Sequence, residues 1–132
     1  MGLFNFFKRN NSRFVSEHQH NKNVAMQKQM NAKVLEQLNI HGVTDNSELE
    51  LEFFFYTNKE DNASNLAIEL NKLNYQINLV AHSASDKNQW VVIGWTTKMK
   101  MDLQTITKWT NQMRKLGCEN DCDFDGWGTQ AD

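Results

Sequence analysis

The ten residues Glu48-Leu-Glu-Leu-Glu-Phe-Phe-Phe-Tyr-Thr57 carry the clearest strand pattern in this chain. Successive side chains of a β-strand point to opposite faces, so strict alternation separates them into two sets. One set consists of Leu49, Leu51, Phe53 and Phe55. The other set consists of Glu48, Glu50, Glu52, Phe54 and Tyr56. We therefore predict a strand with one core face and a second face that is acidic at its start and aromatic at its end.

A helix is predicted before this strand, over residues 23–39, and Gly42 follows it as a stop signal. Its apolar stripe consists of Met30, Val34 and Leu38, widened by Leu35. Two interpretations of the acidic and aromatic strand face remain open. That face is a contact surface, or the N-terminal helix covers it.

A second helix and a hairpin are predicted after the strand. Asn58 is the expected N-cap of this helix, and Asn74 suits the left-handed position after its last turn. The apolar stripe consists of Ala63, Leu66, Ala67, Leu70 and Leu73. Residues 75–83 and 90–98 form the predicted hairpin, with turn residues between them. One face of its first strand is expected to carry Tyr75, Ile77, Leu79 and Ala81.

A third helix and a final strand, over residues 124–129, complete the pattern. Asp102 is the expected N-cap of the helix and Gly117 its expected end. Its stripe consists of Leu103, Ile106, Trp109, Met113 and Leu116. The order β-α-β-β-α-β predicts an α+β, ferredoxin-like fold, in which two helices lie on one face of an antiparallel sheet. The extra N-terminal helix is positioned to cover part of the other face.

Length and charge fit one globular domain without a general attraction to nucleic acid. The chain has 132 residues, a net charge of −2 and a pI of about 6.1, so RNA binding would need a local basic patch. No apolar run approaches the roughly 20 residues that span a bilayer. Cys118 and Cys122 are too few for a disulfide framework, and we expect reduced thiols in a cytoplasmic protein.

We divide the chain into a leader, residues 1–20, and a single domain, residues 21–132. The leader is apolar and basic: it contains Leu3, Phe4, Phe7, Phe14 and Val15 together with Lys8, Arg9 and Arg13. It is either an amphipathic helix on a membrane surface or partner, or a segment that packs on its own domain. The second interpretation is favoured because one or two apolar turns bind membranes weakly.

The segment Asp121-Cys-Asp-Phe-Asp-Gly-Trp-Gly-Thr129 has the most unusual composition. Its alternating carboxylates before Gly126 imitate a calcium-binding loop. However, Gly128 occupies a position where such loops need an apolar residue, and Asp132 replaces the final glutamate. The residues therefore predict neither a metal site nor another cofactor.

No catalytic residues are predicted, because no nucleophile is paired with a base and no glycine-rich phosphate loop is present. The histidines His18, His20, His41 and His82 are scattered. Trp90 and Trp95 are five residues apart and face opposite sides of a regular strand, so one is core and the other is available to stack on an RNA base. The nearby glutamates favour a structural role for both tryptophans.

The residues Asp123-Phe-Asp-Gly-Trp-Gly-Thr129 resemble the C-terminal signature of the regulators of ribonuclease E activity, type B (RraB). Val34-Leu-Glu-Gln-Leu38 with Gly42 resembles the leading helix of that family, and Lys72-Leu-Asn-Tyr75 resembles its helix exit. The resemblance implies a ferredoxin-like α+β domain that is not an enzyme. It also implies that the domain inhibits an endoribonuclease by binding it, which alters the choice of transcripts that are cleaved.

The resemblance makes a protein the expected partner, an endoribonuclease, with no direct nucleic-acid contact and no membrane span. A homo-oligomer is an open alternative, and the rival function is an RNA- or small-ligand-binding domain. The expected partner-binding signature consists of Asp123, Asp125, Gly126, Trp127 and Thr129. Within it, Trp127 is either a binding anchor or a lock that holds the last strand on the sheet.

Overall fold

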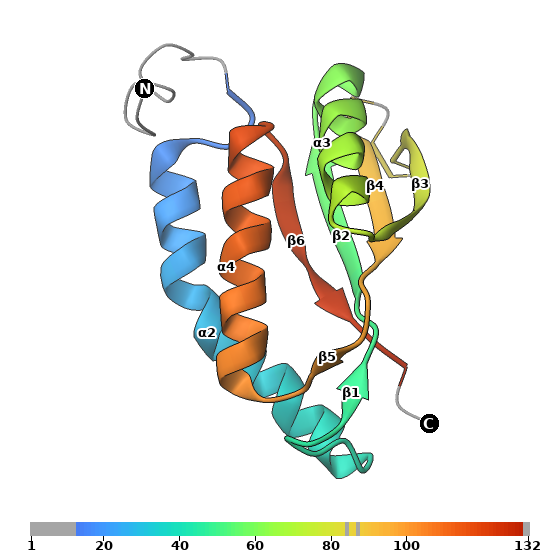
Figure 1. The fold of residues 1–132 in the computed structure, drawn as a ribbon. Coiled ribbons are helices and arrows are strands. Elements are labelled where there is room, and N and C mark those ends of the chain that lie inside the picture. The colour runs from blue at the N-terminus through green and yellow to red at the C-terminus, as the bar shows by residue number, and fades with distance from the viewer. Residues whose placement is uncertain (1–12, 84, 87, 131–132) are drawn as a thin grey trace.

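The computed structural model describes residues 13–83, 85–86 and 88–130. Within them the chain forms three helices and two antiparallel sheets, which confirms the α+β prediction (Figure 1). The helices are α2 (Glu17–Ile40), α3 (Glu60–Lys72) and α4 (Leu103–Glu119). The strands are β1 (Glu48–Leu49), β2 (Glu52–Thr57), β3 (Gln76–His82), β4 (Trp90–Trp95), β5 (Met99–Lys100) and β6 (Asp123–Gly128).

The larger sheet has the strand order β3-β4-β2-β6, and each pair of neighbours is antiparallel. The strand β4 therefore lies between β2 and β3, although α3 connects those two in sequence. The smaller sheet pairs β1 with β5 beyond one end of the larger one (Figure 1). The helix α3 packs on β2, β3 and β4, whereas α4 packs on β6.

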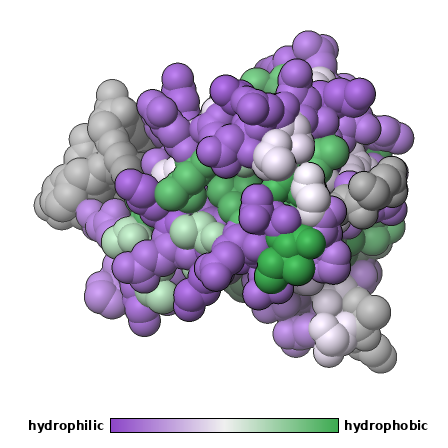
Figure 2. Space-filling view, turned by 90° about the horizontal axis from the view of Figure 1, so that it is seen from below, coloured by the Kyte–Doolittle hydropathy of each residue, from purple (hydrophilic) through white to green (hydrophobic). Residues whose placement is uncertain are grey.

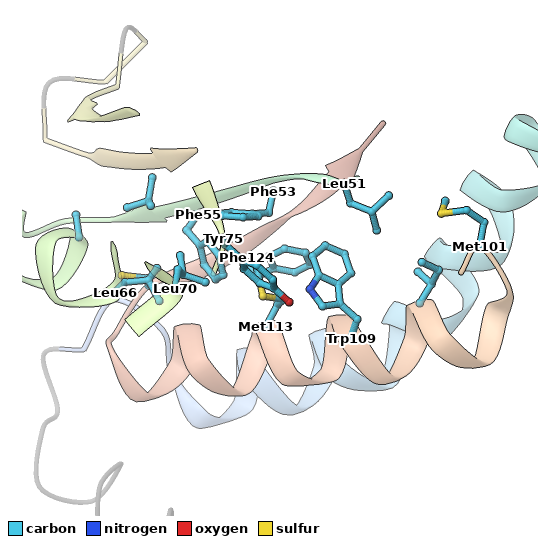
Figure 3. Close-up of a cluster of buried hydrophobic side chains, with 14 of the residues drawn as sticks. Leu51, Phe53, Phe55, Leu66, Leu70, Tyr75, Met101, Trp109, Met113 and Phe124 are labelled. Carbon is cyan, nitrogen blue, oxygen red and sulfur yellow. The ribbon is translucent and has the colours of Figure 1, made fainter. Parts of the chain in front are cut away.

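Side chains from the sheet and from both of these helices meet in one core (Figure 3). Phe53 and Phe55 on β2 are fully buried, and the ring centroid of Phe55 lies 5.2 Å from that of Phe124 on β6. The helices contribute Leu66, Leu70, Ile106, Trp109 and Met113. Full burial of one such side chain stabilises the fold by about 1.5–3 kcal/mol. This shared layer holds α3 and α4 on the same face of the sheet.

The predicted strand over residues 48–57 is interrupted between β1 and β2 by the side chain of Thr96. The Leu51 N–H donates to Thr96 Oγ1 at 2.9 Å, and the Thr96 N–H donates to the Leu51 carbonyl at 2.8 Å. The predicted strand over 90–98 ends early, at Trp95, and β5 begins just beyond the predicted range, at Met99. Leu51, Phe53 and Phe55 are nevertheless all fully buried. The predicted alternation of core residues is therefore confirmed on both sides of the break between β1 and β2.

The helix α2 packs along α4 and not on the second face of the sheet (Figure 1). The expectation that it covers part of that face is therefore wrong. It begins at Glu17, earlier than predicted, because Ser16 caps it by accepting the Gln19 N–H at 3.1 Å. Residues 1–12 of the expected leader lie outside the described residues.

The predicted boundary residues Asp102 and Asn74 are confirmed, whereas Asn58 is wrong. Asp102 caps α4 by accepting the Thr105 N–H at 2.8 Å, and Asn74 adopts a positive φ of 66° after α3. Asn58 is not the cap of α3. Lys59 occupies that position, and its side chain makes no capping hydrogen bond.

The expectation that Gly117 ends the last helix is also wrong, because α4 continues to Glu119. A left-handed residue follows the helix at Asp121, whose φ is 55°. Gly117 is needed for close packing instead. A Cβ at this position would lie 2.6 Å from the Cys122 carbonyl oxygen and 2.8 Å from the Phe55 ring. The missing side chain lets α4 approach β2 and the start of β6.

We predict that Gly117→Ala lowers the free energy of unfolding by about 1–2 kcal/mol. The overlap with Phe55 and a backbone carbonyl, which cannot move easily, should cost about 2–3 kcal/mol, in the upper part of the range for overpacking, whereas alanine in place of glycine contributes roughly 1 kcal/mol to a helix. Urea unfolding measures the difference. The matched control is Gly128→Ala, where a Cβ meets nothing within 4 Å, and it should change stability by less than about 0.5 kcal/mol. A Gly117→Ala variant as stable as the wild type would contradict this packing.

Candidate functional site

The expected signature residues lie on β6, an edge strand that contains a β-bulge. Phe54 on β2 pairs with Gly126, whereas the next residue, Phe55, pairs with Phe124, so Asp125 is an extra residue. Gly126 has a φ of 117°, a conformation that residues with a Cβ rarely adopt. Phe124 and Trp127 are three residues apart and would face opposite sides of a regular strand. Because of the extra residue in the bulge, they pair with Phe55 and Phe53 and both point to the helix side of the sheet. The bulge and the positive φ thus explain why glycine follows Asp125 in this segment.

Trp127 is half-buried and binds within the protein. Its Nε1–H donates to Asn31 Oδ1 on α2 at 2.9 Å. Its ring meets that of Trp109 edge to face, with the centroids 6.4 Å apart. Of the two interpretations of Trp127, this geometry favours a residue that holds the last strand in place over one that binds a partner. The reason is that the indole N–H already donates to another element of the protein.

A buried polar layer joins α2, α4 and β6. Arg114 on α4 donates from Nε to Gln27 Oε1 at 2.6 Å and from NH1 to the Phe124 carbonyl at 3.0 Å. Gln27 in turn donates to Asn31 Oδ1 at 2.9 Å, and Asn31 donates to Thr110 Oγ1 at 2.9 Å. We call these residues, together with Trp127, the polar layer. Its hydrogen bonds make α2 part of the same structural unit as the sheet.

This layer was not predicted from the sequence, because the expected stripe of α2 included only apolar residues. Leu35 and Leu38 of that stripe pack against the core, as expected. Met30 of the same stripe is 43% exposed, whereas the polar residues Gln27 and Asn31 are almost completely buried. The available signal was the spacing. Gln27 and Asn31 are four apart, and so are Thr110 and Arg114, so each pair lies on one side of its helix.

The other signature residues make separate contacts. The Asp123 carboxylate lies 3.9 Å from Arg114 NH1 and accepts from Asn23 Nδ2 at 3.5 Å. Burial raises the pKa of Asp123, an effect that Arg114 opposes. Thr129 Oγ1 donates to the Glu50 carbonyl at 2.7 Å, and Asp125 is exposed.

Asp121, the first carboxylate of the segment that imitates a calcium loop, binds the backbone just before α2. It accepts the N–H groups of Phe14 and Val15 at 3.0 and 2.9 Å, and it lies 3.5 Å from Arg13 NH2. Asp121 and Asp123 therefore bind different parts of the protein. Among residues 13–83, 85–86 and 88–130, no group of three or more His, Cys, Asp or Glu side chains is arranged to hold a metal ion.

Cys118 and Cys122 are both buried thiols without a disulfide. Burial raises the pKa of Cys118 to about 11 and that of Cys122 to about 12. Both therefore stay protonated near neutral pH, which makes them poor nucleophiles and poor metal ligands.

The second face of the larger sheet is covered by no helix of the described chain. Phe54 pairs with Ile93, and Ile93 pairs with Leu79, so these three share that face. We call it the open face, and its large apolar residues are Phe54, Tyr56, Leu79, Ile93 and Trp95. Glu52 pairs with Trp95 at one end. None of these residues packs against the hydrophobic core.

The placement of Leu79 on this face corrects the sequence analysis, which put Ile77 and Leu79 on the same face of the strand. The pairing of β3 with β4 shifts register between Ile77 and Leu79, so the two residues point to opposite faces. The prediction that Trp90 and Trp95 face opposite sides is confirmed. Trp90 packs against the core, and Trp95 lies on the open face.

The end of the molecule formed by α2, β1 and β5 carries an open apolar groove. Its apolar lining consists of Leu35, Val43, Met101 and Leu103, with a volume of about 320 Å³. Figure 2 views this end from below and shows hydrophobic surface enclosed by hydrophilic surface. Glu36 and Asp45 are the charged residues that the described part of the chain contributes to its lining.

His82 offers no arrangement of a base beside a nucleophile. Its ring stacks on Trp90 with the centroids 3.9 Å apart. The nearby Ser83 hydroxyl lies 3.1 Å from that of Ser85.

We predict that Arg114→Met lowers the free energy of unfolding by about 3 kcal/mol. The variant keeps most of the side-chain volume but leaves Gln27 Oε1 and the Phe124 carbonyl without donors, at about 1–3 kcal/mol for each buried group. Thermal or urea unfolding measures the loss. Lys115→Met, at the exposed neighbouring position on α4, is the control and should change stability by less than about 0.5 kcal/mol. Equal stability of the two variants would show that the polar layer contributes nothing.

We also predict a pH effect that depends on Asp123. Because its folded pKa is raised above 3.8, the folded protein keeps this proton at pH values where the unfolded chain has lost it. The unfolding free energy of the wild type, relative to Asp123→Asn, should therefore fall as the pH rises above 3.8. Urea unfolding of both proteins across this range measures the difference. A difference that rises with pH would mean that Arg114 outweighs burial.

The chain matches the protein family described as regulator of ribonuclease activity B over residues 28–129. This range begins within α2 and ends just after β6, so it contains both sheets, the open face and the signature residues. No curated protein matches the chain. Within the described residues, no helix is both long and apolar enough to cross a membrane. Since the match covers most of its length, this protein belongs to the RraB family.

Proposed function

We propose that this protein is a cytoplasmic regulator that binds ribonuclease E, or a ribonuclease of that type, and catalyses no reaction itself. The observation that carries the proposal is the family match over residues 28–129, because the family description names regulation of ribonuclease activity. The strand order β3-β4-β2-β6, with α3 and α4 on one face, supports a ferredoxin-like interpretation of the domain. Such a domain leaves one sheet face available for a partner.

The distribution of charge favours a protein partner over RNA. None of the four strands of the larger sheet contains lysine or arginine, whereas nucleic-acid binding draws most of its affinity from cations near phosphates. The second candidate, a domain that binds RNA or a small ligand, is supported by Trp95 on the open face, where its ring could stack on a base. The adjacent Glu52 argues against that candidate because it repels phosphate.

The signature residues fit this function mainly by shaping the sheet. Trp127 and Asp123 fix β6 to α2 and α4, and Gly126 provides the bulge. Asp125 is exposed and is the signature residue best placed for direct contact with a partner. We propose that the signature holds the sheet in the shape that the partner recognises.

The proposal predicts that the purified chain changes cleavage by purified ribonuclease E. The rate of cleavage of a labelled RNA should fall, or its sites should change, with an effect that saturates near equimolar protein. Binding to the ribonuclease should survive prior digestion of all RNA, because the contact is between proteins.

The control is the same titration against an unrelated endoribonuclease, whose activity should not change. The proposal fails if the chain leaves ribonuclease E unaffected and does not bind it. Retention of the chain on single-stranded RNA in place of the ribonuclease would support the second candidate.

A further inference from the structure

The open face has the composition of a binding surface. Leu79 is 43% exposed, and Phe54, Tyr56, Ile93 and Trp95 are half-buried although none packs against the core. Folded monomers seldom leave several large apolar side chains together on one uncovered sheet face, and such patches mark contact sites. Aromatic residues are also enriched where protein interfaces are most deeply buried.

The edge strand keeps this face accessible. Gly126 pairs with Phe54 and Gly128 pairs with Glu52, so glycines flank both residues on the open face. A Cβ at either glycine would meet no atom within 4 Å. A partner can therefore reach Phe54 from the β6 side without displacing a side chain.

The charge beside this apolar surface is acidic. Glu50 and Glu52 follow the same alternation as Phe54, and the ion pairs of the described residues involve neither of them. Glu48 lies opposite Lys100 in the pairing of β1 with β5. The aromatic and acidic residues that the register of β2 and β4 places on this side are Glu52, Phe54, Tyr56 and Trp95, and the strands of the larger sheet contain no lysine or arginine.

We infer that the open face binds a segment of a protein partner in which lysine or arginine side chains alternate with apolar ones. This inference rests on the proposed function and adds the surface and the chemistry of the partner. The apolar side chains cover Phe54, Ile93 and Leu79. The cations meet Glu50 and Glu52, and a guanidinium can also lie over the faces of Tyr56 and Trp95.

The structure disfavours the other occupants of this face. A single-stranded RNA would stack on Trp95 but would place phosphates near Glu52 without a cation to neutralise them. A second copy of the chain would bring another acidic patch to this face and no cation for Glu50 and Glu52, because a two-fold contact joins the same patch on both subunits. A basic apolar segment avoids both conflicts.

The test uses the full chain labelled with ¹⁵N and a short synthetic peptide of alternating arginine, leucine and phenylalanine. Amide shifts should concentrate on β2, β4 and β6. The Glu50→Lys/Glu52→Lys variant should weaken binding by about tenfold, because two attractive charges become repulsive. The control Glu36→Lys/Glu119→Lys changes charge equally at exposed positions on α2 and α4 and should bind like the wild type.

A second variant, Tyr56→Ser, removes an aromatic ring from this face without altering charge and should also weaken binding. The inference is overturned if shifts fall on the groove beside Leu35 and Val43, if both charge-reversal variants bind equally, or if polyuridylate binds the open face and the peptide does not. If the variants bind the peptide weakly but regulate ribonuclease E normally, the inference fails and the proposed function stands. If the peptide binds as expected but the wild type has no effect on ribonuclease E, the proposed function fails instead.

Discussion

The hydrogen bonds by which Arg114 joins its own helix, α4, to α2 and β6 are the constraint on which the rest of the structure depends. Its guanidinium reaches Gln27 on α2 and the Phe124 carbonyl on β6, while its own backbone belongs to α4. A buried arginine is costly unless its donors are satisfied. The burial that lowers the pKa of Arg114 is opposed by Asp123 and Asp125. The two acids of the signature thus help to keep this cation inside the protein.

This constraint gives the two faces of the sheet different tasks. The helix side carries the core, with Phe53 and Phe55 fully buried, and the polar layer closes it against α2. The opposite side carries aromatic and acidic residues that contribute little to that core. Because α2 binds to α4, it leaves the open face uncovered. The position of α2 is therefore what makes a large contact surface available on so small a domain.

The sequence was sufficient for the features that depend on local periodicity. The alternation through Leu51, Phe53 and Phe55 predicted the core strand, and the stripe through Ile106, Trp109 and Met113 predicted the buried side of α4. These patterns work because burial of apolar side chains dominates where a strand or helix meets the core. The α+β class follows from them.

The remaining features depend on partners that are distant in sequence. Gln27 and Asn31 have the composition of surface residues, and partners far along the chain, Arg114, Thr110 and Trp127, make their burial favourable. Gly117 has the sequence context of a helix end, but its role is set by Phe55. The composition of β6 indicated a candidate site, but the direction of the Trp127 ring depends on the bulge at Gly126.

The two buried thiols have a practical consequence. With a pKa of about 11 for Cys118, only roughly one thiol in ten thousand is ionised at pH 7. Cys122 is still less ionised. Alkylating reagents should therefore modify the folded chain only when it opens. Because Cys118 lies in the last turn of the helix that carries Arg114 and Cys122 precedes β6, the rate of modification reports how often the junction between α4 and β6 separates.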